Sequence, residues 1–240
     1  MIKLEKKESI YFLTMNAEEN RWNTTFVREI SEALDEIEKD DGPGALITSS
    51  TNPKFFSNGL DLDWMQAPEN HPEGGDKEVF GEEFMYLMGR FITLPIPTVC
   101  ALNGHTFGAG FMFALSHDFR IMREDKGFIC ANEMQLGLPI PRPELALFKH
   151  KIPANAFFET VQLSKRWTGA DALKAGIVQG VSSFEELSEA ALRKAKELAP
   201  LANNRKNFGH QKEMLYGENA AINLAHGPAH MLKNSKYFEV

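Results

Sequence analysis

The chain has 240 residues, of which 43% are hydrophobic and 25% charged, a balance typical of folded globular domains and not of a disordered chain. Its 33 acidic residues outnumber its 26 lysines and arginines, and the formal net charge of -7 argues against a surface that binds nucleic acid or anionic membrane lipids. No apolar run reaches the ~18 residues that a membrane span requires. Cys100 and Cys130 each lie in an apolar run, which predicts buried free thiols and neither a disulfide framework nor a metal site.

Short apolar runs alternate with helical patterns along the first half of the chain. In chain order we predict strands over 2–7 and 10–15, a helix over 23–39, a strand over 45–48, a polar loop over 66–78 and a helix from Phe80 to Phe91. The first helix has Asn23 as its cap, and Val27, Ile30 and Leu34 recur at helical spacing. The strand over 10–15 is apolar on both faces, as a covered strand would be.

The second half continues the alternation and then becomes helical. We predict a strand over 98–102, a turn at 103–104, a helix over 108–116, strands over 119–122 and 128–131, and mainly helices from Glu144 onward except at 176–181. This order indicates an α/β fold with a core over residues 1–143 and a mainly helical region over 144–240.

The first segment that could take part in chemistry is Phe55-Phe56-Ser57-Asn58-Gly59-Leu60-Asp61-Leu62. An apolar strand end runs into Asn-Gly, which is a turn signal, and residues after such a turn often have unpaired backbone N–H groups. Taken alone, the segment is better explained as an ordinary strand-to-helix turn that Asp61 caps.

The second segment is the run Asn103-Gly104 through Gly108-Ala109-Gly110, which opens a helix. Small residues allow a ligand to approach the backbone, and a helix N-terminus presents free N–H groups with about half a unit of positive charge. This geometry suits an oxyanion, but close helix packing on small residues explains the run equally well. The glycine spacing does not match a dinucleotide-binding fingerprint.

The third segment places Glu133 directly after an apolar strand and before Leu136-Gly137-Leu138-Pro139. Apolar neighbours would raise the pKa of the carboxyl by desolvation, as a general base that works near neutral pH requires. Considered alone, a surface glutamate at a strand end is the simpler explanation.

In this order the three segments resemble the crotonase family, also called the enoyl-CoA hydratase/isomerase family. Phe56 to Leu62 is similar to the first oxyanion turn of the family, and Asn103 to Asp118 is similar to the second oxyanion segment. Asn132 to Leu138 is similar to the catalytic-acid segment, above all to that of the isomerases. Trp167 to Val178 is similar to a later segment of the family. The resemblance covers roughly residues 2–200. It implies an α/β fold built as a spiral of ββα turns, with a helical C-terminal region that forms a homotrimer or hexamer.

The resemblance also implies a substrate and a site. The substrate is an acyl-CoA thioester, so coenzyme A enters as part of the substrate and no further cofactor is expected. Glu133 is the implied proton shuttle, and the backbone N–H groups of Leu60 and Ala109 form the implied oxyanion hole. The other residues implied to contact the substrate are Phe56, Ser57, Asn58, Gly59, Asp61, Gly108, Gly110 and Met112.

The residue at position 112 favours one branch of the family. Hydratases of this family have a second glutamate there, which helps to hold a water molecule, whereas this chain has Met112, whose thioether cannot take a proton. We therefore expect a Δ3,Δ2-enoyl-CoA isomerase of fatty-acid metabolism. A hydratase, another CoA-thioester enzyme of the same fold and a non-catalytic CoA-ester-binding protein are the alternatives.

The two ends of the chain give an expectation for the compartment. The start lacks the apolar block of a signal peptide, and the end, Tyr237-Phe238-Glu239-Val240, is not a Ser-Lys-Leu peroxisomal address. We expect a cytoplasmic protein, with the peroxisome as the alternative.

Overall fold

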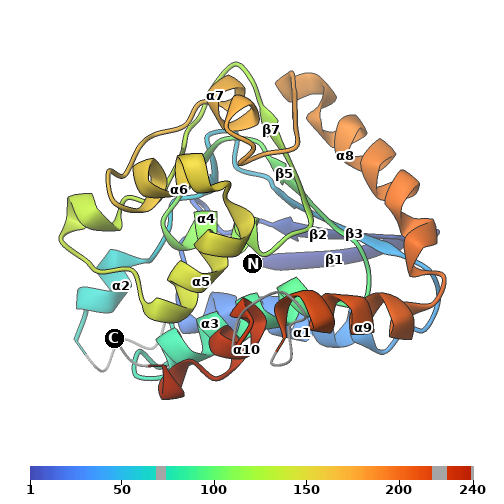
Figure 1. Ribbon diagram of the computed structural model, residues 1–240, viewed down its shortest axis with the longest axis horizontal. Helices are drawn as coiled ribbons and strands as arrows, with labels where there is room; N and C mark the ends of the chain where they lie inside the picture. The colour runs from blue at the N-terminus through green and yellow to red at the C-terminus, as the bar shows by residue number, and fades with distance from the viewer. Residues whose placement is uncertain (69–73, 218–225, 239–240) are drawn as a thin grey trace.

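The computed structural model describes residues 1–68, 74–217 and 226–238, whose strands form two sheets (Figure 1). The larger sheet has six strands in the order β1 (Ile2–Lys7), β2 (Ile10–Met15), β3 (Ala45–Ser50), β5 (Thr98–Leu102), β7 (Phe119–Arg123) and β9 (Gly180–Ser182). The smaller sheet has three strands in the order β4 (Phe55–Ser57), β6 (His105–Phe107) and β8 (Ile129–Cys130). Only β1 and β2 pair antiparallel, and all other described pairs are parallel.

From β3 onward, consecutive strands alternate between the two sheets, which produces the predicted spiral. In each turn of the spiral, the first strand joins the larger sheet, the second joins the smaller sheet, and a helix follows. The three turns are β3–β4 with α2 (Leu62–Gln66) and α3 (Phe80–Thr93), β5–β6 with α4 (Ala109–Leu115), and β7–β8 with the 3-10 helix η1 (Glu133–Leu136) and α5 (Arg142–Lys151). The prediction of an α/β fold built from ββα turns is confirmed.

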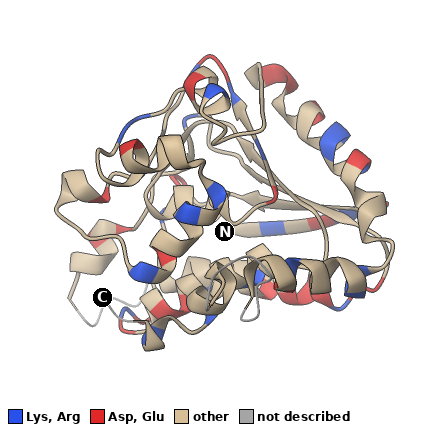
Figure 2. Cartoon of the chain, viewed as in Figure 1, with Lys and Arg blue, Asp and Glu red and all other residues tan. Residues whose placement is uncertain are grey.

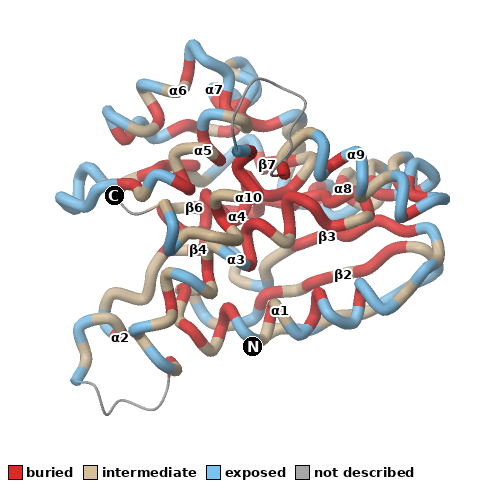
Figure 3. The backbone as a smooth tube through the Cα atoms, turned by 60° about the horizontal axis from the view of Figure 1, so that its bottom comes forward, coloured by how far each residue is buried: buried red, intermediate tan, exposed pale blue. Residues whose placement is uncertain are grey.

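The larger sheet is covered on both faces, which explains the two-sided apolar pattern of β2. One face carries the main core, to which α1 (Thr24–Glu38) contributes Phe26, Ile30 and Leu34. Burial of each such side chain stabilises the fold by about 1.5–3 kcal/mol. The other face carries a smaller core under α8 (Phe184–Leu198), to which β2 contributes Ile10 (Figures 1 and 3).

The local signals for α1 act as predicted. The Asn23 side-chain oxygen accepts a hydrogen bond from the backbone N–H of Phe26 at 2.9 Å, which satisfies one of the free donors of the first helical turn. Trp22, directly before the cap, is fully buried with edge-to-face contacts to Phe26, Phe84 and Phe113. These contacts fix where the chain between β2 and α1 lies.

The region after Glu144 is mainly helical, as predicted, but it also supplies β9 to the edge of the larger sheet. Its further helical elements are α6 (Ala154–Val161), α7 (Gly169–Lys174), η2 (Ala199–Ala202), α9 (Arg205–Tyr216), α10 (Pro228–Lys233) and η3 (Ser235–Tyr237). Figure 2 shows acidic and basic residues interspersed along α8 and the other helices, with no extended stripe of one sign on the face in view. None of the described helices is long and apolar enough to cross a bilayer.

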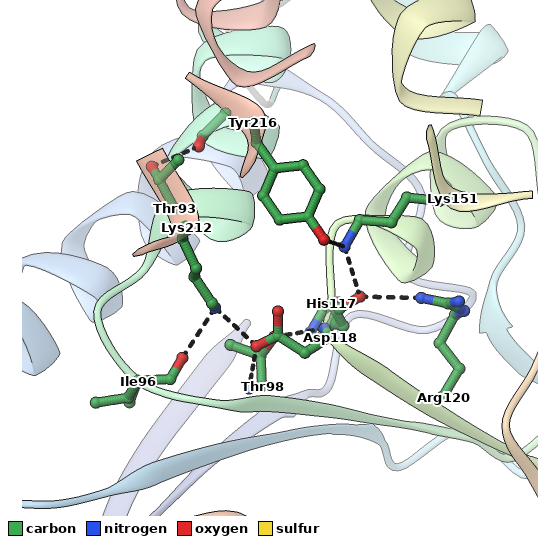
Figure 4. Close-up of polar contacts among 10 residues, drawn as sticks. Thr93, Ile96, Thr98, His117, Asp118, Arg120, Lys151, Lys212 and Tyr216 are labelled. Atoms are coloured by element: carbon green, nitrogen blue, oxygen red, sulfur yellow. Dashed lines mark hydrogen bonds and ion pairs between the residues drawn. The ribbon is translucent and has the colours of Figure 1, made fainter. Parts of the chain in front are cut away.

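A buried ionic network attaches α9 to the rest of the molecule (Figure 4). The Asp118 carboxylate accepts hydrogen bonds from the Lys212 ammonium at 2.7 Å and from the Thr98 N–H at 2.8 Å. Although burial alone would raise it, the pKa of Asp118 lies below its usual value because Lys212 and Lys151 are nearby cations. Burial lowers the pKa of Lys151 to about 7, and its ammonium lies over the Tyr216 ring. The C-terminal helices are therefore part of the same folded unit as the sheets.

Two features of the small sheet differ from the sequence prediction. β6 was not predicted, and β8 is one residue shorter at each end than the expected strand over 128–131. Strands of two or three residues are too short to show the period-two alternation from which strands are predicted. Of the predicted polar loop over 66–78, residues 69–73 lie outside the described part of the chain.

Candidate active site

A cavity of about 470 Å³ lies at the C-terminal ends of β4, β6 and β8. Each of these parallel strands is followed by a turn, and the three turns form one wall of the cavity. Apolar side chains also line it, namely those of Phe80 and Phe84 from α3 and of Leu136 and Leu138. A cavity lined by apolar side chains together with a few polar groups is typical of a site for a small organic ligand.

The turn after β4 holds the Leu60 backbone in a fixed orientation. Leu60 forms an isolated parallel bridge with Trp22, in which the Trp22 N–H donates to the Gly59 carbonyl and the Asp61 N–H donates to the Trp22 carbonyl, both at 2.9 Å. Successive backbone groups point to opposite sides of an extended segment, so the Leu60 N–H points away from Trp22. It donates to no other group within the described residues.

The turn after β6 brings a second free N–H to the same wall. The Gly108 N–H donates to the Cys130 carbonyl at 3.0 Å, which fixes the start of α4. Ala109 is the first residue of this helix, so its N–H has no partner within the helix, and it donates to no other group of the described chain. A Cβ atom added at Gly59 would lie 3.9 Å from the Ala109 nitrogen, which shows that the two turns are adjacent.

Glu133 follows β8 and presents its carboxylate to the same cavity. Its Oε2 atom is buried and has no hydrogen-bond partner among the residues described, and burial raises the pKa of the carboxyl above its usual value. The Oε1 atom would lie 3.1 Å from a Cβ atom added at Gly108. Glycine at position 108, which has a positive φ of 49°, therefore leaves the space that the carboxylate occupies beside Ala109.

A second carboxylate of the cavity was missed by the sequence analysis. Glu144, in the first turn of α5, lines the cavity and is only 6% exposed. Burial, together with the charge of Glu133, raises the pKa of Glu144 to about 8. In the sequence, an acidic residue after Pro141-Arg142-Pro143 looks like an ordinary first-turn acid of a helix, and nothing in the pattern shows that it is buried.

The remaining predicted residues divide into two groups. Asn58, Gly59, Gly108 and Met112 line the cavity together with Leu60, Ala109 and Glu133. Phe56, Ser57, Asp61 and Gly110 do not line it.

Three residues of the second group pack in the core next to the residues that line the cavity. Ser57 is fully buried, where its hydroxyl accepts from the Trp22 indole N–H at 3.0 Å and donates to the Asn20 carbonyl at 2.7 Å. Gly110 lies directly against Ser57, because an added Cβ atom would come within 2.6 Å of that side chain. Phe56 is stacked in the core on Phe113.

Asp61, the last of these four residues, has a structural role that the sequence suggested. Its carboxylate accepts from the Trp64 N–H at 3.1 Å and so caps α2. These four residues do not line the cavity, and their direct contact with substrate stays a prediction.

Comparison with known proteins places the chain in a family. The family model described as "Enoyl-CoA hydratase/isomerase" matches residues 5–224. Enoyl-CoA delta isomerase 3 of Arabidopsis thaliana is 32% identical over 222 residues, which are 91% of this chain and 93% of that protein. The peroxisomal enoyl-CoA delta isomerase 2 of the same plant is 31% identical over 227 residues, 92% of this chain and 95% of that protein.

A solved structure shows the same relationship in three dimensions. The human mitochondrial delta3-delta2-enoyl-CoA isomerase superposes with a TM-score of 0.81 at 25% identity, and the match covers 98% of this chain and 87% of that chain. The resemblance inferred from the three ordered segments agrees with both kinds of comparison. The chain belongs to the enoyl-CoA hydratase/isomerase family.

Proposed function

We propose that the protein is a Δ3,Δ2-enoyl-CoA isomerase that uses Glu133 as its proton shuttle. The observation that supports this proposal most strongly is the Glu133 carboxylate, whose Oε2 atom is buried without a hydrogen-bond partner among the described residues and which lines the same cavity as Leu60 and Ala109 with their free N–H groups. The names of the Arabidopsis relatives support the same reaction. As in other members of the family, the substrate is an acyl-CoA thioester, and coenzyme A is the only cofactor-like group that we expect.

The reaction begins with binding of the thioester carbonyl oxygen between the N–H groups of Leu60 and Ala109. Glu133 removes a proton from C2, and the electron pair of the C–H bond passes into a dienolate whose oxygen carries the negative charge. Protonated Glu133 then donates the same proton to C4, and the double bond now lies between C2 and C3. Because loss of one oxyanion donor costs about 10²–10³ in rate in a known enzyme, the N–H pair contributes as strongly as the base.

The environment of Met112 argues against hydration as the main reaction. The side chain is almost fully buried in the cavity wall, at the position where the hydratases of the family have a second glutamate. A thioether cannot orient water through an ionised oxygen, and it excludes water from the dienolate. Glu144, a further carboxylate of the cavity, belongs to the first turn of α5, whereas the second glutamate of the hydratases corresponds to Met112 in α4.

Product analysis tests this proposal. Incubation with 3-hexenoyl-CoA is expected to give 2-hexenoyl-CoA, and incubation with 2-hexenoyl-CoA is expected to give little 3-hydroxyhexanoyl-CoA, both followed by NMR or mass spectrometry. Release of free coenzyme A would indicate a thioester hydrolase. Binding of 3-hexenoyl-CoA without either product and without exchange of the C2 proton would contradict an enzymatic function.

The pH profile tests the role of the second carboxylate. Glu133 must be ionised to accept the C2 proton, so the rate falls as the pH drops through its raised pKa. Glu144 loses its proton as the pH rises through about 8, and the second negative charge then opposes formation of the dienolate. We expect a bell-shaped profile whose alkaline limb is lost in Glu144→Gln while the acidic limb is retained. An alkaline limb that is unchanged in this variant would exclude Glu144 as its source.

The same shift in pKa has a consequence for stability. Between pH 4.5 and about 8 the folded state keeps a proton on Glu144 that the unfolded state releases, so the free energy of unfolding falls as the pH rises through this interval. The Glu144→Gln variant lacks this contribution. Denaturant unfolding at pH 5 and at pH 8.5 should therefore show that the variant gains stability relative to the wild type at the higher pH.

The oligomeric state and the cellular compartment of the protein are proposed by analogy with the family. We propose a homotrimer or hexamer, and the exposed apolar side chains of the helical C-terminal region, Phe158, Leu163 and Leu201, each at least 60% exposed in the single chain, support an interface there. Light scattering would measure the assembly. The cytoplasmic location expected from the sequence stays a prediction, and two relatives from Arabidopsis thaliana are named as peroxisomal.

A further inference from the structure

The carboxyl group of Glu144 lines the cavity without a hydrogen-bond partner among the described residues. Its side chain is almost fully buried, and burial and the charge of Glu133 both raise its pKa, while no nearby cation or hydrogen-bond donor lowers it. Buried polar groups are normally hydrogen-bonded, and one that lacks a partner destabilises the fold. The folded chain alone therefore gives no reason for an acidic residue at this position.

The local sequence removes the partners that an acid in the first turn of a helix usually has. Such a side chain commonly reaches back to the free backbone N–H of the N-cap residue, three positions earlier. For Glu144 the N-cap residue is Pro141, which has no N–H, and the residue directly before Glu144 is Pro143, which has none either. No side-chain cap hydrogen bond forms at this end of α5. The carboxyl is therefore free to interact with a bound molecule.

The packing of α5 gives Glu144 a fixed position in the cavity. Phe148 lies one helical turn after Glu144, on the same face of α5. The Phe148 ring meets the ring of Phe111 in α4 edge-to-face, with 5.4 Å between the two centroids. This contact holds α5 against α4, which supplies Ala109 and Met112 to the same cavity.

The other side chains of the cavity leave Glu144 as a polar group in a mainly apolar space. Arg21, the single lysine or arginine among the described residues that line the cavity, is paired with Glu19 and Asp63. An unsubstituted acyl chain that excludes water from this space would leave the Glu144 carboxyl without any partner. The apolar side chains that line the cavity are Phe80, Phe84, Met112, Leu136, Leu138 and Pro139.

The protonation state of Glu144 indicates which chemical group is a suitable partner. Because its pKa is about 8, the carboxyl is protonated at neutral pH and has both an O–H donor and acceptor oxygens. A hydroxyl group has the same combination, so the carboxyl O–H can donate to the hydroxyl oxygen while the hydroxyl donates to the other carboxyl oxygen. A cationic group would first require loss of the Glu144 proton, which burial and the charge of Glu133 oppose.

We propose that Glu144 is a specificity-determining residue that forms hydrogen bonds with a hydroxyl group on the acyl chain, so that the preferred substrates are hydroxylated 3-enoyl-CoA thioesters. This proposal rests on the proposed function in that the ligand is an acyl-CoA thioester whose acyl chain enters the cavity. It gives the carboxyl a partner in the complex that it lacks in the free protein. A site with a buried group that pairs with a substrate hydroxyl discriminates against the analogue without the hydroxyl.

Equilibrium binding measured by calorimetry tests the proposal without turnover, because saturated thioesters have no double bond to shift. The probes are 6-hydroxyhexanoyl-CoA and 8-hydroxyoctanoyl-CoA, which place the hydroxyl at two depths, and each is compared with the unsubstituted thioester of the same length. At neutral pH the wild type is expected to bind at least one hydroxylated thioester about 5- to 100-fold more tightly than its parent, the range for a buried polar group that gains its partner.

Two substitutions of Glu144 separate hydrogen bonding from shape. Glu144→Leu should abolish the preference, since leucine fills a similar space but forms no hydrogen bond, whereas Glu144→Gln keeps a donor and an acceptor and should retain most of it. Thermal unfolding of the free variants should show no loss of stability, because the replaced group has no partner. Glu159→Leu on α6 is the matched control and should keep the wild-type preference, because Glu159 pairs with Lys165 at the surface and does not line the cavity.

Three results would overturn the proposal. The first is equal binding of hydroxylated and unsubstituted thioesters at both lengths, or a preference that persists in Glu144→Leu. The second is tighter binding of 6-aminohexanoyl-CoA than of 6-hydroxyhexanoyl-CoA by the wild type but not by Glu144→Leu, which would mean that an ionised Glu144 binds a cation. The third is a loss of stability in both Glu144 variants, which would give the carboxyl a structural role. Isomerase assays with 3-hexenoyl-CoA report the proposed function separately.

Discussion

Replacement of Glu133 by glutamine is expected to lower kcat for conversion of 3-hexenoyl-CoA by about 10²–10⁴, the usual contribution of a general acid–base group. The amide has nearly the same shape as the carboxylate but cannot take the C2 proton. Since burial disfavours the charged form of Glu133 and its Oε2 atom has no hydrogen-bond partner among the described residues, removal of its charge should leave the protein at least as stable as the wild type. Initial rates of 2-hexenoyl-CoA formation and thermal unfolding measure the two effects.

The control for this variant is Glu159→Gln on α6. Glu159 pairs with Lys165 at the surface and does not line the cavity, so the same chemical change there should leave the rate unaltered. Coenzyme A should bind Glu133→Gln as tightly as it binds the wild type. More than a tenth of the wild-type rate in Glu133→Gln would mean that another group, with Glu144 the first candidate, removes the proton.

Replacement of Gly108 by alanine is expected to lower kcat about 10-fold while the variant still folds. The added Cβ atom would lie 3.1 Å from Glu133 Oε1 and 3.4 Å from Asn132 Oδ1, so the carboxylate must shift by a few tenths of an ångström. Since a displacement of about 1 Å costs about 10² in rate, this smaller shift should cost less. Rates at saturating 3-hexenoyl-CoA measure the effect.

Gly176→Ala separates displacement of Glu133 from backbone strain. Gly176 also has a positive φ, 75°, and its added Cβ atom would approach Pro153 to 3.0 Å, but it follows α7 and does not line the cavity. Both variants should lose stability, since alanine is disfavoured at positive φ, and Gly108→Ala should lose more because the ψ of -120° at this position lies outside the left-handed helical region. If Gly176→Ala reduces kcat as much as Gly108→Ala does, the positioning role of Gly108 is wrong.

The sequence was sufficient to predict the elements whose structure is determined by a local pattern. Asn23 and the spacing of Val27, Ile30 and Leu34 predict α1, whose observed range is Thr24–Glu38. The two-sided apolar pattern over 10–15 predicts a covered strand, and β2 contacts a core on each face of its sheet. The three ordered segments predict the spiral through their resemblance to the enoyl-CoA hydratase/isomerase family.

The sequence was not sufficient where function depends on contacts between distant segments. Glu144 has the local pattern of a first-turn acid, and only the packing of α5 against the cavity shows that it is buried. Phe56, Ser57 and Gly110 belong to segments that contribute other residues to the cavity but do not line it themselves, because they pack against Phe113, Trp22 and one another.

The central claim is that one carboxylate carries a proton from C2 to C4 of a bound 3-enoyl-CoA. Substrate labelled with deuterium at C2 tests this claim most directly, because a single shuttle returns part of the label to C4 of the product. We predict 2-hexenoyl-CoA in which C4 contains deuterium at the earliest measurable conversion, together with some label lost to solvent. Product whose C4 hydrogen comes entirely from solvent, even at the first turnovers, would show that Glu133 does not deliver the proton that it removes.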